Sequence, residues 1–425
     1  MEIPDALNVH LNRYHVGVLT RLPGNLVTFY FTQAYLDDPG RPTLSWGLFD
    51  AYKRLRAHQP PSTLGRVPPF FANLLPEGDL RKYIAHRGGI SKIDDFALLW
   101  ITGDDLPGAV TLHDPLDRAL PPPTAGGPDY EVPQNEMLRF SLAGVQLKFS
   151  AIENAYGGLT IPVQGRDGQW IAKLPSRHLE RVPENEFAML QFAAAVGIDV
   201  PEIKLLDVAD IKNLPEEARG IEGLAMATRR FDRRANGERI HIEDFNQIYR
   251  QEPREKYDNR SFANIAETVY QALGNDGLIA FIHRLVFNIA IANNDMHLKN
   301  WSFIYRDGRT PTLAPAYDYI CTKVYVNTSE TGLAIGRARN FQGITMEQMR
   351  FMAQRARVSS GVVEEAAREM IARVRAVWKN TRDRLPFEAM RDTIEDQLER
   401  VPLFNPATTP IPVPDVPPRK RTEIS

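Results

Sequence analysis

The segment NNDMHLKNWSF (293–303) places several polar side chains directly after GLIAFIHRLVFNIAIA (277–292), whose apolar residues recur at helical spacing. One capping residue is enough to end a helix, whereas this segment supplies Asp295, Lys299 and Asn300. Magnesium prefers oxygen ligands, and proteins often hold it through a few such side chains together with substrate phosphates. The segment therefore indicates chemistry on phosphate groups in addition to a helix end.

A second acidic residue, Asp318, follows a predicted pair of short strands in 301–325 and lies between tyrosines in AYDYI. Protein kinases use an aspartate, an asparagine five residues later, and then a second aspartate that binds metal. The first aspartate orients or accepts the proton of the attacking hydroxyl, and the other two groups hold Mg²⁺. This pattern makes Asp295 the candidate catalytic residue and Asn300 and Asp318 the candidate metal ligands. The Asp-to-Asn spacing also occurs by chance, and Asp318 alone also fits a turn.

A lysine and a glutamate further upstream support this interpretation. Lys173 stands in the predicted strand WIAKLP (170–175), and Glu186 stands on the predicted helix 184–198. A strand lysine that pairs with a helix glutamate positions the ATP phosphates in kinases. The alternative is that Lys173 is an outward-facing lysine on an edge strand.

A candidate phosphate-binding loop, SLAGVQLK (141–148), precedes this strand. It contains one pair of small residues, Ala143 and Gly144, and no GxGxxG pattern. Its backbone amides could surround phosphate oxygens, but the segment is also compatible with a β-turn. The loop is therefore a weaker indication than the lysine and the glutamate.

The composition bounds the class of protein. A chain of 425 residues is too long for one ordinary core, so two or three domains are expected. The formal net charge of -2 shows no basic excess for direct nucleic-acid binding. The single cysteine, Cys321, excludes intramolecular disulfides and cysteine-based zinc cages. The N-terminal residues lack a signal-peptide core, and no run reaches the ~18 apolar residues of a membrane span, so we expect a cytoplasmic protein.

The elements that must position these residues form a strand-rich part followed by a helix-rich part. Strands are predicted at 8–19, 25–36, 203–208 and 224–231. Helical spacing is present at 49–58, a short helical pair is predicted at 70–88 and 92–103, and a Pro/Gly-rich linker follows. Helices are also predicted at 262–273, 277–292, 345–357, 360–380 and 386–400.

Nine short segments, taken in order, resemble the HipA family of serine/threonine-kinase toxins of bacterial type II toxin–antitoxin systems. The segments are FFANLLPEGDLR, LLWITGDDLPGAV, SLAGVQLK, IAKLP, ENEFAMLQFAAAVGIDVP, RRFDR, IEDFNQI, NNDMHLKNWS and LAPAYDYI. The resemblance covers about residues 10–400 and implies an α+β fold, in which a small β-rich N-terminal subdomain joins a two-lobed protein-kinase-like core. The implied parts are the N-terminal subdomain 1–115, the linker 116–136, the N-lobe 137–231, the helical C-lobe 232–402 and a Pro-rich, disordered tail 403–425.

The resemblance also implies roles for individual residues. Asp295 resembles the catalytic aspartate, Lys173 the phosphate-positioning lysine, and Asn300 and Asp318 the metal-binding residues. Ser141 falls where the family carries an autophosphorylated serine whose phosphorylation silences the kinase. The implied ATP site comprises Ala143, Gly144, Val145, Gln146, Leu147, Lys148, Lys173, Glu186, Arg229, Arg230, Phe231, His297, Lys299, Asn300, Tyr317 and Asp318.

One of these positions departs from the family pattern. Arg229 stands where the adenine-binding hinge commonly carries a glutamate. Backbone atoms usually make the adenine hydrogen bonds, so ATP binding is still expected.

The implied function is an ATP- and Mg²⁺-dependent serine/threonine protein kinase that acts on a translation protein of the aminoacyl-tRNA synthetase class. The implied partner is a HipB-like helix-turn-helix antitoxin, through which the toxin reaches operator DNA. Two alternatives are a kinase-like scaffold with weak catalysis in the antitoxin–operator complex, and a small-molecule kinase of aminoglycoside-phosphotransferase type. The presence of every side chain that catalysis needs favours an active kinase over a scaffold. The N-terminal 115 residues and Ser141 argue against a small-molecule kinase.

Overall fold

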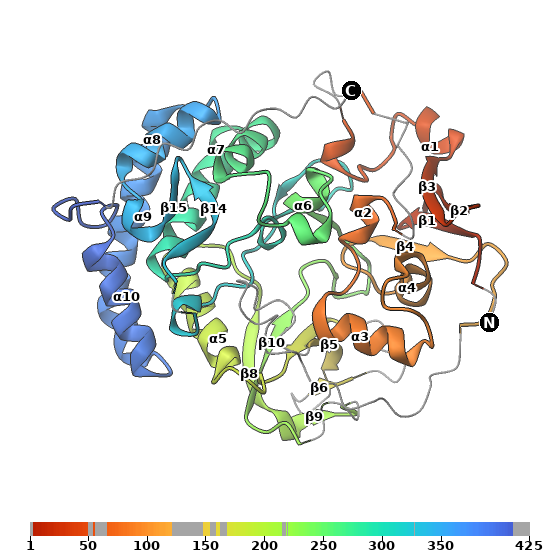
Figure 1. Cartoon of the computed structure of the whole chain (residues 1–425), viewed down its shortest axis with the longest axis horizontal. Helices are drawn as coiled ribbons and strands as arrows, with labels where there is room; N and C mark the ends of the chain where they lie inside the picture. Colours follow the sequence, from red (N-terminus) through yellow and green to blue (C-terminus); the bar gives the residue numbers. More distant parts are fainter. Residues whose placement is uncertain are drawn as a thin grey trace. The chain divides into compact units, whose positions relative to one another are not determined.

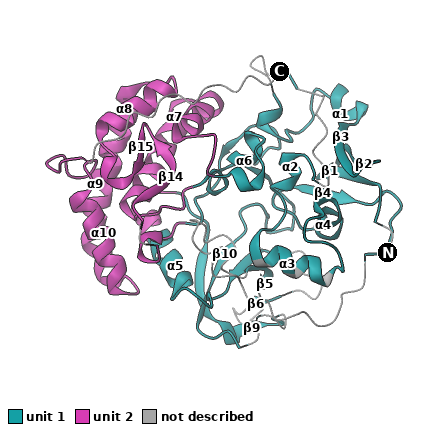
Figure 2. Cartoon of the chain, in the orientation of Figure 1, with its two compact units in different colours: residues 1–191, 199–256, 297–318 teal, residues 192–198, 257–296, 319–425 magenta. Residues whose placement is uncertain are grey.

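The computed structural model has both helices and sheets, and its parts are labelled in Figure 1. The structure describes residues 3–49, 54–55, 66–120, 148–153, 159–161, 168–214, 218, 220–326 and 328–410. The chain divides into two units, which Figure 2 colours separately. The first unit comprises residues 1–191, 199–256 and 297–318, and the second comprises 192–198, 257–296 and 319–425.

The chain begins with a four-stranded antiparallel sheet in the order β3-β2-β1-β4. The expected single strand at 8–19 is wrong, because Asn12 adopts a positive φ of 52° and the chain turns back so that Leu11 pairs with Tyr14. The second predicted strand ends early, because Thr32 caps a short helix. The elements are β1 (Ala6–Leu11), β2 (Tyr14–Leu22), β3 (Leu26–Phe31), β4 (Val110–His113) and helix α1 (Gln33–Asp37).

Three helices follow within the same unit: α2 (Pro69–Ala72), α3 (Gly78–Arg87) and α4 (Asp95–Thr102). The predicted helix 70–88 is thus broken at 73–77, where Pro76 disfavours helical backbone in the residue before it. The predicted helix at 49–58 lies mostly outside the described residues, and its described residues Phe49 and Leu55 form an isolated antiparallel bridge instead.

A six-stranded sheet in the order β8-β10-β7-β5-β6-β9 carries Lys173. Lys173 ends β7, which pairs antiparallel with β5 on one side and β10 on the other. The edge-strand interpretation of Lys173 is therefore wrong. The strands are β5 (Lys148–Glu153), β6 (Leu159–Thr160), β7 (Trp170–Lys173), β8 (Ile203–Asp207), β9 (Ile211–Lys212) and β10 (Leu224–Arg229), and helix α5 (Val182–Ala195) follows β7.

The first unit also contains a three-stranded sheet in the order β11-β12-β13. The two short strands expected in 301–325 are confirmed as β12 and β13, whereas β11 and the short helix α6 were not expected. Asp244 caps α6 in a reciprocal capping box with Gln247. The elements are β11 (His241–Asp244), α6 (Phe245–Ile248), β12 (Ser302–Tyr305) and β13 (Thr312–Leu313).

The second unit is mainly helical, as predicted. The two helices expected at 262–273 and 277–292 are present as one element, α7, interrupted at Gly274, whose φ of 66° and ψ of -154° are not helical. The hairpin of β14 and β15 was not predicted. The elements are α7 (Phe262–Ala290), β14 (Glu330–Ile335), β15 (Ala338–Asn340), α8 (Met346–Arg355), α9 (Ser360–Thr381) and α10 (Glu388–Arg400).

The core of the second unit forms where aromatic side chains from several elements meet. The ring centroid of Phe192 lies 5.1 Å from that of Phe287 on α7 and 5.8 Å from that of Trp378 on α9. None of the helices in the described part of the chain combines the length and apolar character needed to cross a bilayer.

Candidate active site

Lys173 is the centre of a buried group of charges in the first unit. Its Nζ donates to Oε1 of Glu186 on α5 at 2.6 Å and also to Oδ1 of Asp318. The pairing of the strand lysine with the helix glutamate is therefore confirmed. The Glu186 side chain is 1% exposed, whereas 36% of the Asp318 side chain remains exposed, so that this carboxylate is accessible to a ligand.

The electrostatics of this group keep both members of the Lys173–Asp318 pair charged. Burial lowers the pKa of Lys173, but the carboxylates of Asp318 and Glu186 outweigh it and raise the pKa above its ordinary value. Burial raises the pKa of Asp318, but the Lys173 ammonium outweighs it and holds that pKa below its usual range. For Glu186, burial dominates and the pKa is raised. Oε2 of Glu186 has no hydrogen-bond partner among the described residues.

The backbone holds Asp318 in an unusual conformation. Its φ is +54°, in the left-handed region that non-glycine residues seldom adopt and that is enriched at functional sites. The preceding residue Tyr317 anchors the turn, because its hydroxyl donates to the carbonyl oxygen of Lys299 at 2.8 Å and lies 2.5 Å from Oγ of Ser302. These bonds connect the turn at Asp318 to the segment that carries Asn300.

Asp295 belongs to the second unit and is buried there. The Tyr257 hydroxyl donates to Oδ1 of Asp295, and the backbone N–H of Asp295 donates to Oδ1 of Asn293 at 3.1 Å. The neighbouring Asn294 is fixed by Thr322, whose Oγ1 accepts from the Asn294 N–H at 2.7 Å. The polar residues that follow α7 therefore hold the loop around Asp295. This role explains why the sequence has more polar residues there than a helix cap needs.

His297, Lys299 and Asn300 lie in the first unit, where residues 298–300 form a short 3-10 turn. Burial and the nearby charge of Lys256 hold the pKa of His297 well below its ordinary value, so its ring is neutral. The N–H of Asn300 donates to the His297 carbonyl oxygen at 3.1 Å. Nζ of Lys299 pairs with Oε1 of Glu77 at 2.5 Å.

Glu77 was missed by the sequence reasoning. It stands in FFANLLPEGDLR, which contributed to the family resemblance without any assigned role. The sequence signal that could have identified Glu77 as a candidate site residue is its acidic side chain within that segment.

The structure thus brings together Lys173, Glu186 and Asp318, and the register of β5 and β7 places Lys148 directly opposite Lys173. An amide and a carboxylate, Asn300 and Asp318, are donors that fit Mg²⁺ when phosphates supply further oxygens. Among the described residues, no group of three or more His, Cys, Asp and Glu side chains could hold a metal ion. The predicted residues Ser141, Ala143, Gly144, Val145, Gln146 and Leu147 lie outside the described residues.

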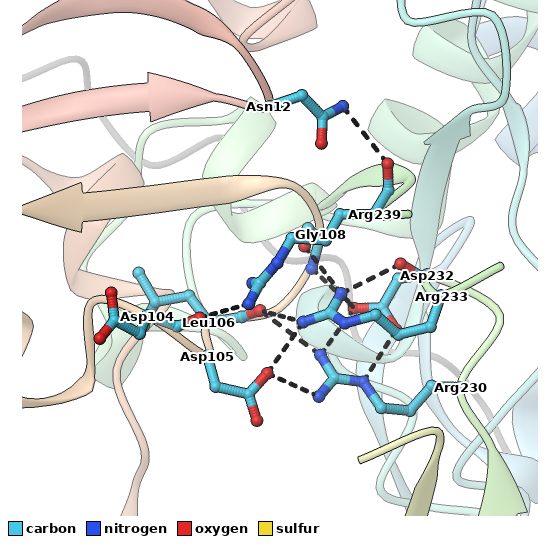
Figure 3. Close-up of polar contacts among 9 residues, drawn as sticks. All are labelled: Asn12, Asp104, Asp105, Leu106, Gly108, Arg230, Asp232, Arg233 and Arg239. Carbon is cyan, nitrogen blue, oxygen red and sulfur yellow. Dashed lines mark hydrogen bonds and ion pairs between the residues drawn. The ribbon is translucent and has the colours of Figure 1, made fainter. Parts of the chain in front are cut away.

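The predicted hinge at 229–231 is anchored by a network of arginines and aspartates, shown in Figure 3. Arg230 binds the Asp232 carboxylate through two bonds of 3.0 and 2.9 Å, and its Nη1 reaches Oδ1 of Asp105 at 2.9 Å. Arg233 also reaches Oδ1 of Asp105 at 2.9 Å. The Arg230 guanidinium is therefore committed to this network. The Arg229 side chain instead forms a solvent-exposed ion pair with Glu202 at 2.9 Å.

The loop between α4 and β4 completes this network. The N–H of Gly108 donates to Oδ2 of Asp232 at 2.8 Å, and its carbonyl oxygen accepts from Arg233 at 2.9 Å. Gly108 has a φ of +75°, and an added Cβ would lie 2.9 Å from the Ile242 backbone nitrogen, so a side chain is excluded there. The loop between α4 and β4 thus holds the residues that directly follow β10.

Comparisons with known proteins identify the family to which this chain is similar. Residues 140–379 match the family model described as the HipA-like C-terminal domain, and residues 7–113 match the HipA N-terminal domain. The chain is 44% identical over 403 residues to Y4dM of Sinorhizobium fredii, named as a candidate kinase, and the match covers 94% of this chain and 98% of that protein. It is 26% identical over 305 residues to the serine/threonine-protein kinase toxin HipA of Shewanella oneidensis, covering 62% of this chain and 65% of that protein.

A solved structure shows the shared fold. The HipA–HipB–operator DNA complex of Shewanella oneidensis MR-1 contains a chain that matches with a TM-score of 0.70 at 19% identity, covering 93% of this chain and 96% of that one. The expected α+β, kinase-like fold is therefore confirmed. The two family-model matches, together with the similarity to Y4dM over 94% of the chain, show that this chain belongs to the HipA family.

Proposed function

We propose that this chain is an ATP- and Mg²⁺-dependent serine/threonine protein kinase. The observation that carries the proposal is the joint pairing of Lys173 with Glu186 and Asp318 in the first unit. A lysine held by a helix glutamate next to a metal-binding aspartate is the arrangement that positions ATP phosphates in kinases. The kinase names of the relatives support the same reaction class.

In this proposal, Lys173 would orient the ATP phosphates, and Asn300 and Asp318 would hold Mg²⁺. The metal supplies positive charge that offsets the charge on the transferring phosphoryl group. Asp295 orients the substrate hydroxyl and takes its proton. A bond forms between that hydroxyl oxygen and the γ-phosphorus, and the bond from the γ-phosphorus to the β–γ bridging oxygen breaks, so that ADP leaves. The neutral His297 ring adds no charge to the site.

We further propose that the kinase is the toxin of a HipA/HipB-type system in the cytoplasm. The similar solved complex contains HipA, HipB and operator DNA, which supports a HipB-like antitoxin as the partner and operator DNA as a target reached through it. The proposed substrate is a translation protein of the aminoacyl-tRNA synthetase class. A phosphate adds roughly −1.5 to −2 charge, which can block a site that binds ATP or tRNA.

Autophosphorylation of Ser141 is the proposed means of silencing. Ser141 opens the candidate phosphate-binding loop 141–148, so a phosphate on it would place negative charge beside the site for the ATP phosphates. The same charge repulsion would favour displacement of the loop.

The experiment that tests the proposed function is phosphoproteomics after brief expression of the wild-type chain and of Asp295→Asn. The proposal predicts growth arrest and new phosphoserine or phosphothreonine on a translation protein with the wild type alone. Identical phosphoproteomes would contradict it, and growth arrest without new phosphorylation would favour the scaffold alternative. Phosphorylated metabolites without phosphorylated proteins would favour the small-molecule kinase.

A further inference from the structure

We propose that Glu77, in the N-terminal subdomain, is a positioning residue for the segment 297–300 that carries the metal-binding Asn300. This inference rests on the proposed kinase function and adds to the site a residue from outside the kinase-like core. Glu77 stands at the end of the connection between α2 and α3, directly before α3.

The Glu77 carboxylate holds two lysines, one within this segment and one whose backbone bonds to it. Oε1 accepts from Nζ of Lys299 at 2.5 Å, and Oε2 accepts from Nζ of Lys256 at 2.9 Å. The backbone carbonyl oxygen of Lys256 in turn accepts from the N–H of Leu298 at 3.1 Å. The Glu77 carboxylate therefore fixes the segment in two ways. It holds the side chain of Lys299, the neighbour of Asn300, and it holds Lys256, whose carbonyl oxygen binds the segment's backbone.

The connection that carries Glu77 is itself held in a buried position. The carbonyl oxygen of Asn73 accepts a second bond from Lys299 at 3.3 Å. The Asn73 side chain donates to the Gln251 carbonyl oxygen at 2.8 Å and accepts from the Asn246 amide at 2.9 Å. Both asparagines are buried, so these bonds form away from water, where they fix geometry most strongly. The carboxylate is thus presented from a rigid support.

The charges explain why removal of Glu77 would disturb the segment. Burial raises the pKa of Glu77, but Lys299 and Lys256 outweigh it and hold the pKa well below its usual range. The Lys256 and Lys299 side chains are 7% and 16% exposed. Without the carboxylate, two poorly solvated ammonium groups would face each other, and their repulsion would displace Lys299 together with Asn300.

The first test measures hydrogen–deuterium exchange of the full chain without nucleotide. Glu77→Gln is expected to speed exchange in peptides covering 297–302 by about tenfold or more, since local opening exposes the bonded amides of Leu298 and Asn300. Lys299→Met, the second variant, should produce the same change. Arg66→Gln is the matched control, because it breaks the 3.3 Å pair of Arg66 with Glu252, which also links the N-terminal subdomain to the core. Unchanged exchange in folded Glu77→Gln and Lys299→Met would overturn the inference.

The second test measures the Mg²⁺ concentration for half-maximal phosphotransfer. Glu77→Gln should raise it by about tenfold to a hundredfold, as loss of a residue that orients a metal ligand does. Lys299→Met should have a similar effect, and the double variant should lose less than the sum of the two single losses, because both residues share the contact between Glu77 and Lys299. Fully additive effects, or an unchanged Mg²⁺ requirement, would overturn the positioning role. If the wild type transfers no phosphate, the proposed kinase function fails, and the exchange experiment still decides whether Glu77 holds the segment.

Discussion

Nζ of Lys173 lies 2.6 Å from Oε1 of Glu186, so the last residue of β7 is bonded to helix α5. The same ammonium binds Asp318, which is 145 positions away in the sequence. One lysine thus connects the central strand of the six-stranded sheet, the following helix and the turn that carries the second acidic residue. The proposed nucleotide site depends on this combination of elements.

Replacement of Lys173 by alanine should abolish most catalysis. Lys173→Ala removes the cation proposed to orient the phosphates, and we expect phosphotransfer to fall by at least about a hundredfold. It also leaves the 1%-exposed Glu186 carboxylate without its partner, at a cost of about 3–5 kcal/mol of stability. Steady-state kinetics and urea unfolding measure the two effects. The control is Lys212→Met, which replaces an exposed lysine of the same sheet. An unchanged rate in Lys173→Ala would show that Lys173 is purely structural.

Replacement of Ser141 by alanine should abolish self-labelling. The prediction rests on the position of Ser141 at the start of the candidate phosphate-binding loop. Incubation with γ-labelled ATP followed by gel autoradiography measures it, with Asp295→Asn as the unlabelled control. Equal label on the Ser141 variant and the wild type would move the modification to another residue.

Much of the site could be predicted from the sequence because its signals are local. The strand around Lys173, the helix around Glu186 and the break after residue 292 each follow from short-range periodicity. The pairing of Lys173 with Glu186 could be predicted because elements that follow one another in the sequence usually pack together.

The remaining features depend on tertiary contacts that periodicity does not encode. Glu77 meets Lys256 and Lys299 across 179 and 222 positions. The turn at Asn12 was overlooked because apolar residues alternate on both sides of it and hide the reversal. The hairpin β14–β15 lacks a strong turn dipeptide at 336–337, so its strands were not distinguished from loop.

Replacement of Asp105 by asparagine should destabilise the anchor of the hinge. Asp105 accepts from Arg230 and Arg233, whose side chains are 7% and 4% exposed. Because loss of the Asp105 charge leaves two buried guanidinium groups sharing Asp232, we expect the free energy of unfolding to fall by about 3–5 kcal/mol. Chemical denaturation measures the change. Glu202→Gln, which breaks the exposed pair with Arg229, should cost less than about 1 kcal/mol, and equal costs for the two variants would contradict the importance of burial.

Stability should fall as pH rises through the range in which Glu243 ionises. This side chain is fully buried, and burial raises its pKa to about 7, although bonds from Ser45, Trp46 and Tyr305 oppose the shift. Because the folded pKa is raised, the stabilising contribution is complete below the unfolded value of about 4.5 and is lost as pH rises to about 7. The free energy of unfolding falls by about 3 kcal/mol, because each unit of the difference between the folded and unfolded pKa corresponds to about 1.36 kcal/mol.

The comparison with Glu243→Gln isolates this group from other titrations. Unfolding free energies of the two proteins should diverge between about pH 4.5 and pH 7, with the variant becoming relatively more stable as pH rises. A difference that stays constant over this range would contradict the raised pKa of Glu243.

The proposed phosphotransfer is tested most directly by transfer of label from γ-labelled ATP by the purified chain, with and without Mg²⁺, for the wild type and for Asp295→Asn. The proposed mechanism predicts Mg²⁺-dependent labelling of a serine or threonine hydroxyl by the wild type. It also predicts at least about a hundredfold loss in Asp295→Asn, with an unchanged unfolding midpoint. Full transfer by Asp295→Asn, or transfer by the wild type that does not respond to removal of Mg²⁺, would contradict the proposed mechanism.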